Sequence, residues 1–267
     1  MVILNAENVT YAYSEEFVGI ETEFKLHCPS LTVSEHEIIY IVGPNGSGKS
    51  TLLSLLSEER RPAEGHVTLR SPRSGKPRIA TLQARDHELL IGNLSVGEHI
   101  IAAMKINGGR QSQPDMQKRG WFYWNDCGRL TRWLADERVA RFVSNSEFKQ
   151  VRFLSSGQRQ LLILLLLTIG RSPDIIFADE PTSHLDDRHA EALFTTISSL
   201  GTAAVIVTHD LEAASRHADS IYLVDDGRVL HLDDAMARMD SLSGVAAKMA
   251  ADLAEKRKKW CSDVPGS

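Results

Sequence analysis

A glycine-rich loop is the first part of the chain whose residue types and spacing could do chemistry. Two glycines, Gly43 and Gly48, are separated by four residues and followed by Lys49 and Ser50. Glycines let backbone N–H groups converge on phosphate oxygens, and a helix that starts at the loop adds partial positive charge. The lysine can reach the β- and γ-phosphates, and the serine hydroxyl can hold Mg²⁺. The predicted triphosphate site comprises Gly43, Pro44, Asn45, Gly46, Ser47, Gly48, Lys49, Ser50 and Thr51.

An acidic pair is the second group that could do chemistry. Asp179 and Glu180 come directly after the apolar run 175–178. A carboxylate at the end of a strand beside a phosphate loop can organise the ligand shell of Mg²⁺, and Asp179 is the candidate for this role. Glu180 is the candidate general base that polarises water for attack on the γ-phosphate. The alternative is that these residues only end a strand and start a turn. The Thr-His-Asp sequence at 208–210, after another apolar run, argues against that alternative.

Short apolar runs must position these groups. Five runs are strand candidates: 38–42, 68–69, 79–82, 175–178 and 203–207. The first runs straight into the glycine loop, and a helix is expected from about Ser50 to Leu56. Three of the runs end at polar residues, where open α/β sheets place their ligands. The alternation of such runs with amphipathic stretches predicts an α/β protein.

The composition shifts between about residues 86 and 150. Strand-like runs vanish there, helical periodicity dominates, and Trp121, Trp124 and Trp133 appear. We interpret this segment as a helical insertion, with a loop at 107–114, in a nucleotide-binding core formed by residues 1–85 and 151–230. Apolar residues at helical spacing then predict a helical tail at 231–267.

Composition and charge exclude several classes of function. The formal net charge is −5, so no nucleic acid partner is expected. Three widely spaced cysteines favour a reducing compartment without a disulfide framework. The N-terminus lacks a secretory pattern, and the longest apolar run, 161–169, is about half the ~20 residues that cross a bilayer. We therefore expect a cytoplasmic chain whose membrane role, if any, comes through a partner.

The segment Leu154-Ser155-Ser156-Gly157-Gln158-Arg159-Gln160 decides between families of phosphate-loop proteins. It ends about twenty residues before the acidic pair. With this order of motifs, the chain resembles ATP-binding subunits of ATP-binding cassette (ABC) transporters over roughly residues 4–230. The resemblance implies a P-loop NTPase core, an antiparallel β subdomain and a helical subdomain insertion. We call residues 154–160 the signature segment.

The resemblance also implies roles for residues outside the phosphate loop. The signature segment, through Ser155, Gly157 and Gln158, would bind the γ-phosphate of an ATP held by a second cassette. His209 would contact the γ-phosphate in its own subunit. Gln83, at the boundary of the insertion, would join Mg²⁺ or the attacking water. Asp186 belongs to the stretch 181–186, which resembles the D-loop of the family.

The nucleotide base and the catalytic metal complete the expected site. Tyr13 matches the aromatic residue that stacks on adenine in the family, with Tyr11 as the competitor and packing within a sheet as the alternative for both. The implied metal ligands are Ser50, Gln83 and Asp179, and the implied catalytic residues are Glu180, His209, Gln83 and Lys49.

Three departures from the family pattern leave the subfamily of the chain unassigned. Ser156 and His36 stand where glycine is usual, and the run 161–167 is more uniformly apolar than usual. Ala178 before the acidic pair resembles lipoprotein-release and macrolide-export cassettes, whereas 183–186 resembles iron-complex importers. The direction of transport and the substrate therefore stay open.

The resemblance implies an ATPase that uses ATP and Mg²⁺, pairs with a second cassette and drives a transmembrane permease from the cytoplasmic face of the inner membrane. The alternatives are mechanotransmission to a membrane partner, or a cassette that acts on ribosomes or DNA. A single phosphate loop, and a gap of about a hundred residues between that loop and the signature segment, favour transport. Exposed aromatics at 121–124 suit docking of the permease, with a small helical core as the equal alternative. The basic end of the tail, 256–260, suits either anionic lipid or solvent.

Overall fold

The computed structural model describes residues 1–17, 20–73, 75–83, 90–108, 137–169 and 172–263. It divides into two compact units. The first unit comprises Met1–Ile79, Asp174–Glu180 and Ala203–Ser267, and the second comprises Ala80–Pro173 and Pro181–Thr202. The aromatic stretch 121–124 and Trp133 lie outside the described residues. The predicted boundaries of the insertion, about 86 and 150, stay a prediction.

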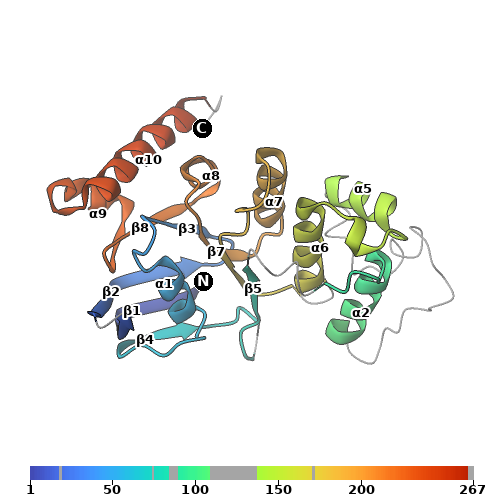
Figure 1. Ribbon diagram of the computed structural model, residues 1–267, viewed down its shortest axis with the longest axis horizontal. Coiled ribbons are helices and arrows are strands. Elements are labelled where there is room, and N and C mark those ends of the chain that lie inside the picture. Colours follow the sequence, from blue (N-terminus) through green and yellow to red (C-terminus); the bar gives the residue numbers. More distant parts are fainter. Residues whose placement is uncertain (18–19, 74, 84–89, 109–136, 170–171, 264–267) are drawn as a thin grey trace. The chain divides into compact units, whose positions relative to one another are not determined.

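The first unit is built on a mixed sheet (Figure 1). Its strands are β1 Val2–Phe17, β2 Ile20–Ser34, β3 Ile38–Val42, β4 Glu64–Leu69, β6 Ile175–Asp179, β7 Ala203–Val207, β8 Ser220–Asp225 and β9 Arg228–His231. They lie in the order β4-β1-β2-β9-β8-β3-β7-β6. Strand β3 pairs parallel with β7 and β8, and β6 pairs parallel with β7. Strand β1 pairs antiparallel with β2 and β4. The predicted α/β class and its antiparallel β part are confirmed.

Burial explains the parallel strands. All five residues of β3 and all five of β7 are buried, as expected of strands covered on both faces. The helices of this unit are α1 Lys49–Leu56, α8 Leu211–His217, α9 Leu232–Ala237 and α10 Gly244–Asp263, with a short 3₁₀ turn at Met239–Ser241. Leu52 and Leu55 of α1 join Phe177 of β6 in one apolar core. This core fixes the phosphate loop, which connects β3 to α1.

The second unit is mainly helical. Its elements are β5 Ile79–Gln83, which begins at the last residue of the first unit, α2 Val96–Gly108, α5 Glu137–Ser146, a 3₁₀ turn at Val151–Phe153, α6 Ser156–Thr168 and α7 Asp187–Ser199. Helix α6 packs against α2 and α7, and α2 also packs against α5. Four consecutive residues of α6, 162–165, are buried. A helix with neighbours on several sides needs an apolar surface around most of its circumference, which accounts for the leucine run.

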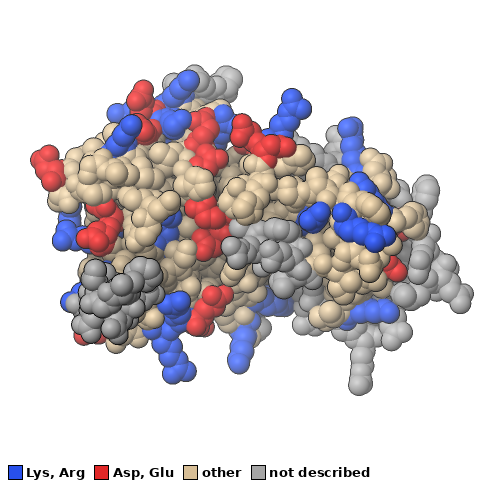
Figure 2. Space-filling model, viewed as in Figure 1, with Lys and Arg blue, Asp and Glu red and all other residues tan. Residues whose placement is uncertain are grey.

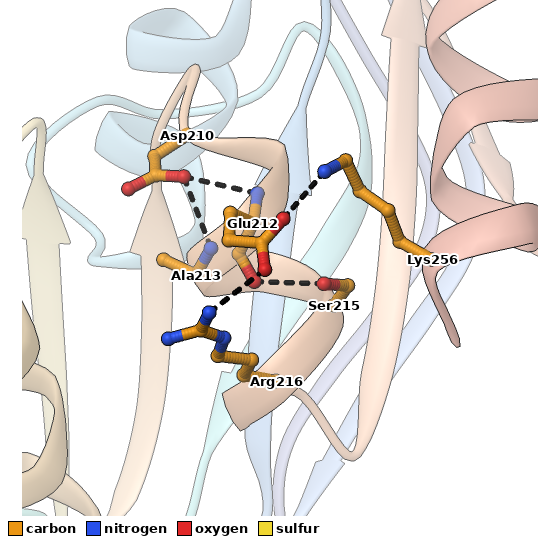
Figure 3. A network of polar contacts seen from close by, with 6 residues as sticks. All are labelled: Asp210, Glu212, Ala213, Ser215, Arg216 and Lys256. Atoms are coloured by element: carbon orange, nitrogen blue, oxygen red, sulfur yellow. Dashed lines mark hydrogen bonds and ion pairs between the residues drawn. The ribbon is translucent and has the colours of Figure 1, made fainter. Parts of the chain in front are cut away.

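The C-terminal helix α10 packs on α8. Ala246, Ala250 and Leu253 of α10 are fully buried, so this helix has an apolar face. Lys256 contacts the carboxylate of Glu212 on α8, so this part of the basic end is paired within the chain (Figure 3). None of the described helices combines the length and the hydropathy that crossing a bilayer demands.

Candidate functional site

Two glycines shape the phosphate loop. Gly48 has a φ of 106°, in the left-handed region, and a β-carbon there would lie 2.5 Å from Cζ of Phe24. A β-carbon on Gly43 would lie 2.2 Å from the carbonyl oxygen of Val224. Both distances are far below van der Waals contact, so only glycine fits at these positions. The loop can then turn closely around an anion with its backbone groups exposed to it.

Lys49 begins helix α1 and is enclosed by the loop. Its side chain is buried, and Nζ donates to the carbonyl oxygens of Gly43, at 2.9 Å, and Pro44, at 2.8 Å. Burial lowers the pKa of the Lys49 ammonium, while the carboxylates of Glu180 and Asp179 act in the opposite direction. The cation and the two carboxylates therefore share one small region of the first unit.

The acidic pair ends strand β6. Glu180 has a φ of 46°, a left-handed conformation that is rare for residues other than glycine. Its backbone N–H donates to the carbonyl oxygen of Val207 at 3.0 Å, which ties the strained residue to the end of β7. Strained backbone of this kind costs about 1–3 kcal/mol and is concentrated at functional sites.

His209 follows β7 and reaches the acidic pair. Its Nδ1 lies 2.7 Å from Oε2 of Glu180. The approach does not have hydrogen-bond geometry, because Glu180 Oε2 has no hydrogen-bond partner among the described residues. The histidine side chain is 65% exposed, whereas that of Glu180 is 26% exposed. The imidazole thus lies at the solvent side of a carboxylate that points inward.

Three buried polar atoms at this site lack hydrogen-bond partners within the described part of the chain. They are Ser47 Oγ, Asp179 Oδ1 and Glu180 Oε2. Such atoms are rare because each one costs free energy when it is left unpaired. Carboxylate and hydroxyl oxygens are the ligands that Mg²⁺ prefers, and a hydroxyl can also bond a phosphate oxygen. The residues present therefore fit a magnesium–nucleotide complex.

An aromatic group on β1 and β2 borders the phosphate loop. The rings of Tyr13 and Phe24 have centroids 5.2 Å apart, and Phe24 is the residue that approaches Gly48. Tyr11 is instead covered by Arg60, which donates to its hydroxyl at 3.3 Å. Phe24 was not singled out from the sequence. The sequence carries no signal for it, because its pairing with Tyr13 depends on the register of β1 against β2.

The signature segment begins helix α6 in the second unit. Ser155 is the N-cap: its Oγ accepts from the Gln158 N–H at 3.2 Å, and the Gln158 side chain accepts from the Ser155 N–H at 3.2 Å. This reciprocal capping box fixes the first turn of the helix. Ser155 and Ser156 are exposed, whereas Gly157 is buried. The N-terminus of a helix carries partial positive charge and favours a nearby anion.

Gln83 and Asp186 also lie in the second unit. Gln83 ends β5, and its carbonyl oxygen accepts from Nε2 of Gln160 on α6 at 3.3 Å. Asp186 caps α7, where its carboxylate accepts from the His189 N–H at 3.0 Å. Hydrogen bonds first from that N–H and then from the His189 ring lower the pKa of Asp186. Gln160, which was not assigned a role from the sequence, is thus the link between the signature helix and Gln83.

The structure groups the predicted residues in two sets. The first unit brings together the phosphate loop, Asp179, Glu180 and His209, with Tyr13 reaching the loop through Phe24. The second unit holds Gln83, the signature segment and Asp186.

Comparison with known proteins identifies the family. A family model described as ABC transporter matches residues 26–183, more than half of the chain. This chain belongs to the ABC transporter ATP-binding family. It is 30% identical to the uncharacterized ABC transporter ATP-binding protein MJ0873 of Methanocaldococcus jannaschii over 85% of this cassette and 75% of that protein. It is 29% identical to the arginine transport ATP-binding protein ArtM of Bacillus subtilis, over 85% of this cassette and 91% of ArtM.

Solved structures support the same assignment. The cassette MJ0796, in a dimeric post-hydrolysis state bound to ADP and Pi, matches with a TM-score of 0.59 and 25% identity over 85% of this cassette and 96% of that chain. The cbiO1 protein of Clostridium perfringens, part of the cbiONQ transporter complex, has the same fold with a TM-score of 0.63 and 20% identity, over 99% and 96%. The protein is an ABC transporter ATP-binding subunit with a P-loop NTPase fold.

Proposed function

We propose that this cassette binds ATP together with Mg²⁺, pairs with a second cassette around the nucleotide, and hydrolyses ATP to drive a transmembrane permease. The observation that carries the proposal is the cluster of Lys49, Asp179, Glu180 and His209 beside the phosphate loop, with three buried polar atoms left unpaired. A site of this composition favours a highly charged anion and its counter-ion over any apolar ligand.

Each residue of the first unit then has a role set by its chemistry. Lys49 holds the β- and γ-phosphates, and Tyr13 stacks on the base. Ser50 and Asp179 would hold Mg²⁺, which neutralises phosphate charge when it is bound. The family resemblance adds Gln83 as a proposed ligand. Glu180 takes the proton of the attacking water. His209, in contact with the Glu180 carboxylate, orients that base and contacts the γ-phosphate.

The signature segment serves the nucleotide of a second cassette. Ser155 donates its hydroxyl, and the first amides of α6, near Gly157 and Gln158, face the γ-phosphate. Asp186 approaches the same interface. The support is the capped first turn of α6, at which Ser155 and Ser156 are exposed, and the similarity to a cassette solved as a dimer.

A patch of exposed apolar side chains in the second unit suits docking of the permease. Ile91 is 59% exposed, Phe148 is 71% exposed and Phe153 is 61% exposed. Backbone hydrogen bonds from Arg152 to Gly92 and from Val151 to Leu94, both 3.0 Å, hold the two segments of the patch together. Exposed aromatic and aliphatic anchors of this kind are typical of protein interfaces. The cassette would thereby be held at the cytoplasmic face of the inner membrane.

Purification from detergent-solubilised membranes tests this partner. We expect a polytopic membrane protein to accompany the wild-type chain and to be lost from a Phe148→Ser, Phe153→Ser variant. Recovery of ribosomes or nucleic acid in its place would contradict the transport function.

Removal of the proposed base tests the chemistry. Glu180→Gln removes the proton acceptor and keeps the side-chain shape, so we expect ATP turnover to fall about 10²- to 10⁴-fold while ATP affinity is kept. Glu58→Gln is the matched control, because Glu58 is an exposed glutamate that also has a left-handed backbone, with a φ of 62°. Near-normal hydrolysis by Glu180→Gln would rule out Glu180 as the base.

A further inference from the structure

Two side chains join the beginning of α6 to the segment 184–189 within the second unit. Ser156 Oγ donates to the carbonyl oxygen of His184 at 3.3 Å. The imidazole of His189 lies against Gly157, where a β-carbon would be 2.5 Å from His189 Cδ2. Both contacts are made by side chains, one from α6 itself and one from the segment 184–189.

The His189 ring is held in place by Asp186. Its Nδ1 lies 2.8 Å from Asp186 Oδ1 and 2.8 Å from Oδ2. Because an ionised carboxylate only accepts hydrogen bonds, Nδ1 carries a proton and donates it. The same Oδ1 accepts from the His189 backbone N–H. One carboxylate therefore fixes both the backbone and the ring of His189, and the ring can move little unless Asp186 moves too.

The ring in turn restricts the signature segment. Gly157 has no positive φ, so its backbone would accept other residues. What excludes a side chain there is the imidazole, whose Cγ and Cβ would also lie within 2.8 Å of the added β-carbon. A glycine in helical conformation at this position is explained by close packing rather than by dihedral strain.

We propose that His189 is a positioning residue which, with Ser156, holds the signature segment and Asp186 together as one rigid piece. This inference rests on the proposed function, in which both parts meet a second cassette. If they move as one piece, ordering one of them on the partner's nucleotide orders the other without further loss of entropy. Loss of the coupling should therefore weaken pairing of cassettes and leave ATP binding in the first unit unchanged.

His189 can be replaced without emptying the core. Its side chain is 46% exposed and forms one wall of an open cleft of about 250 Å³, together with Arg141 and Gln158. Removal of the ring enlarges a space that is already open to solvent, so the variants should fold. His189→Asn is the conservative variant, because the Asn amide nitrogen can take the position of Nδ1 and donate to Asp186.

The test measures pairing in a Glu180→Gln background with ATP and Mg²⁺. We expect His189→Ala to raise the dissociation constant of the ATP-dependent dimer about three- to tenfold, the loss expected for one net hydrogen bond. His189→Asn should recover most of that loss, and His66→Ala, at another exposed histidine paired with a glutamate, should have no effect. ATP affinity of the monomer should stay the same in every variant.

Three outcomes would overturn the inference: pairing by His189→Ala equal to that of the parent, an Asn variant no better than the Ala variant, or a parallel loss of monomer ATP affinity. Failure of the Glu180→Gln parent to pair would instead contradict the proposed function. In that case, amide hydrogen exchange of the protein without nucleotide still tests whether His189 holds the signature segment. His189→Ala should speed exchange of the amides of 158–160 at least threefold, and unchanged exchange would refute it.

Discussion

Glu180 shows how much chemistry depends on one backbone conformation. With a φ of 46° the residue leaves the strand direction of β6, and its carboxylate stands beside Lys49 and His209. Strain of this kind persists only where surrounding bonds hold it, here the hydrogen bond to Val207. Nothing in the sequence predicts a left-handed backbone conformation at Glu180. His36, with a φ of 65° where glycine is usual, is a second such position.

Replacement of the loop lysine tests the nucleotide site at the residue scale. Lys49→Ala removes the buried cation that the phosphates would engage, and a charge-assisted hydrogen bond contributes about 1.5–3 kcal/mol. We therefore expect ATP affinity to fall at least about tenfold in a nucleotide titration. Lys76→Ala, at an exposed lysine of the same unit, is the control. Unchanged affinity of Lys49→Ala for ATP would contradict the assignment of the phosphate loop.

The sequence indicates the side chains of the proposed site but not the packing contacts that hold them in place. Lys49 follows from the spacing of the loop glycines, and Asp179 and Glu180 follow from their place after an apolar run. The packing of Phe24 on Gly48 and of His189 on Gly157 joins residues far apart in the chain. Such contacts depend on strand register and helix packing, neither of which a single sequence specifies.

At the scale of elements, buried parallel strands were the easiest to predict. Strands β3 and β7 have the expected bounds, since both are short continuous runs of apolar, partly β-branched residues. The long hairpin of β1 and β2 was implied only by the family resemblance, because its faces are partly exposed and its pattern is weak. The helical tail was predicted from its spacing, but its docking partner α8 was not.

Helix α10 holds α8, the helix that follows His209. Glu212 of α8 contacts Lys256 and also pairs with Arg216 at 2.9 Å (Figure 3). The Arg216 guanidinium lies 4.4 Å from the centroid of the Trp260 ring. Asp210 caps the same helix through the N–H groups of Glu212 and Ala213. These contacts fix the element to which the His209 loop is attached.

The ion pair makes a pH-dependent contribution to stability. The contact with Lys256, above all, lowers the pKa of Glu212 from its ordinary value of 4.5. The stabilisation is therefore fully present above pH 4.5 and is lost as the pH falls through the lowered pKa. We expect Lys256→Met to lower the melting temperature by about 1–3 °C at pH 7, and the difference should vanish in acid. Lys258→Met on the same helix is the control, and a difference that grows in acid would contradict this assignment.

At the scale of the whole molecule, charge and surface fit a subunit that works on a small anion and a protein partner. The net charge is −5, and on the face drawn in Figure 2 the basic side chains of the described residues are scattered among other surfaces rather than gathered in one patch. A chain of this kind attracts phosphate locally, through Lys49 and helix ends, instead of through a broad positive field. In the proposed function, the signature segment serves the nucleotide of a second cassette.

ATP-dependent pairing is the most direct test of the central claim, that two cassettes close around nucleotide. In sedimentation velocity, Glu180→Gln with ATP and Mg²⁺ should have twice the mass of the single chain, and with ADP it should have the mass of the single chain. Lys49→Ala in the same background should stay a single chain in both. A Glu180→Gln protein that binds ATP and remains a single chain at high protein concentration would contradict the claim.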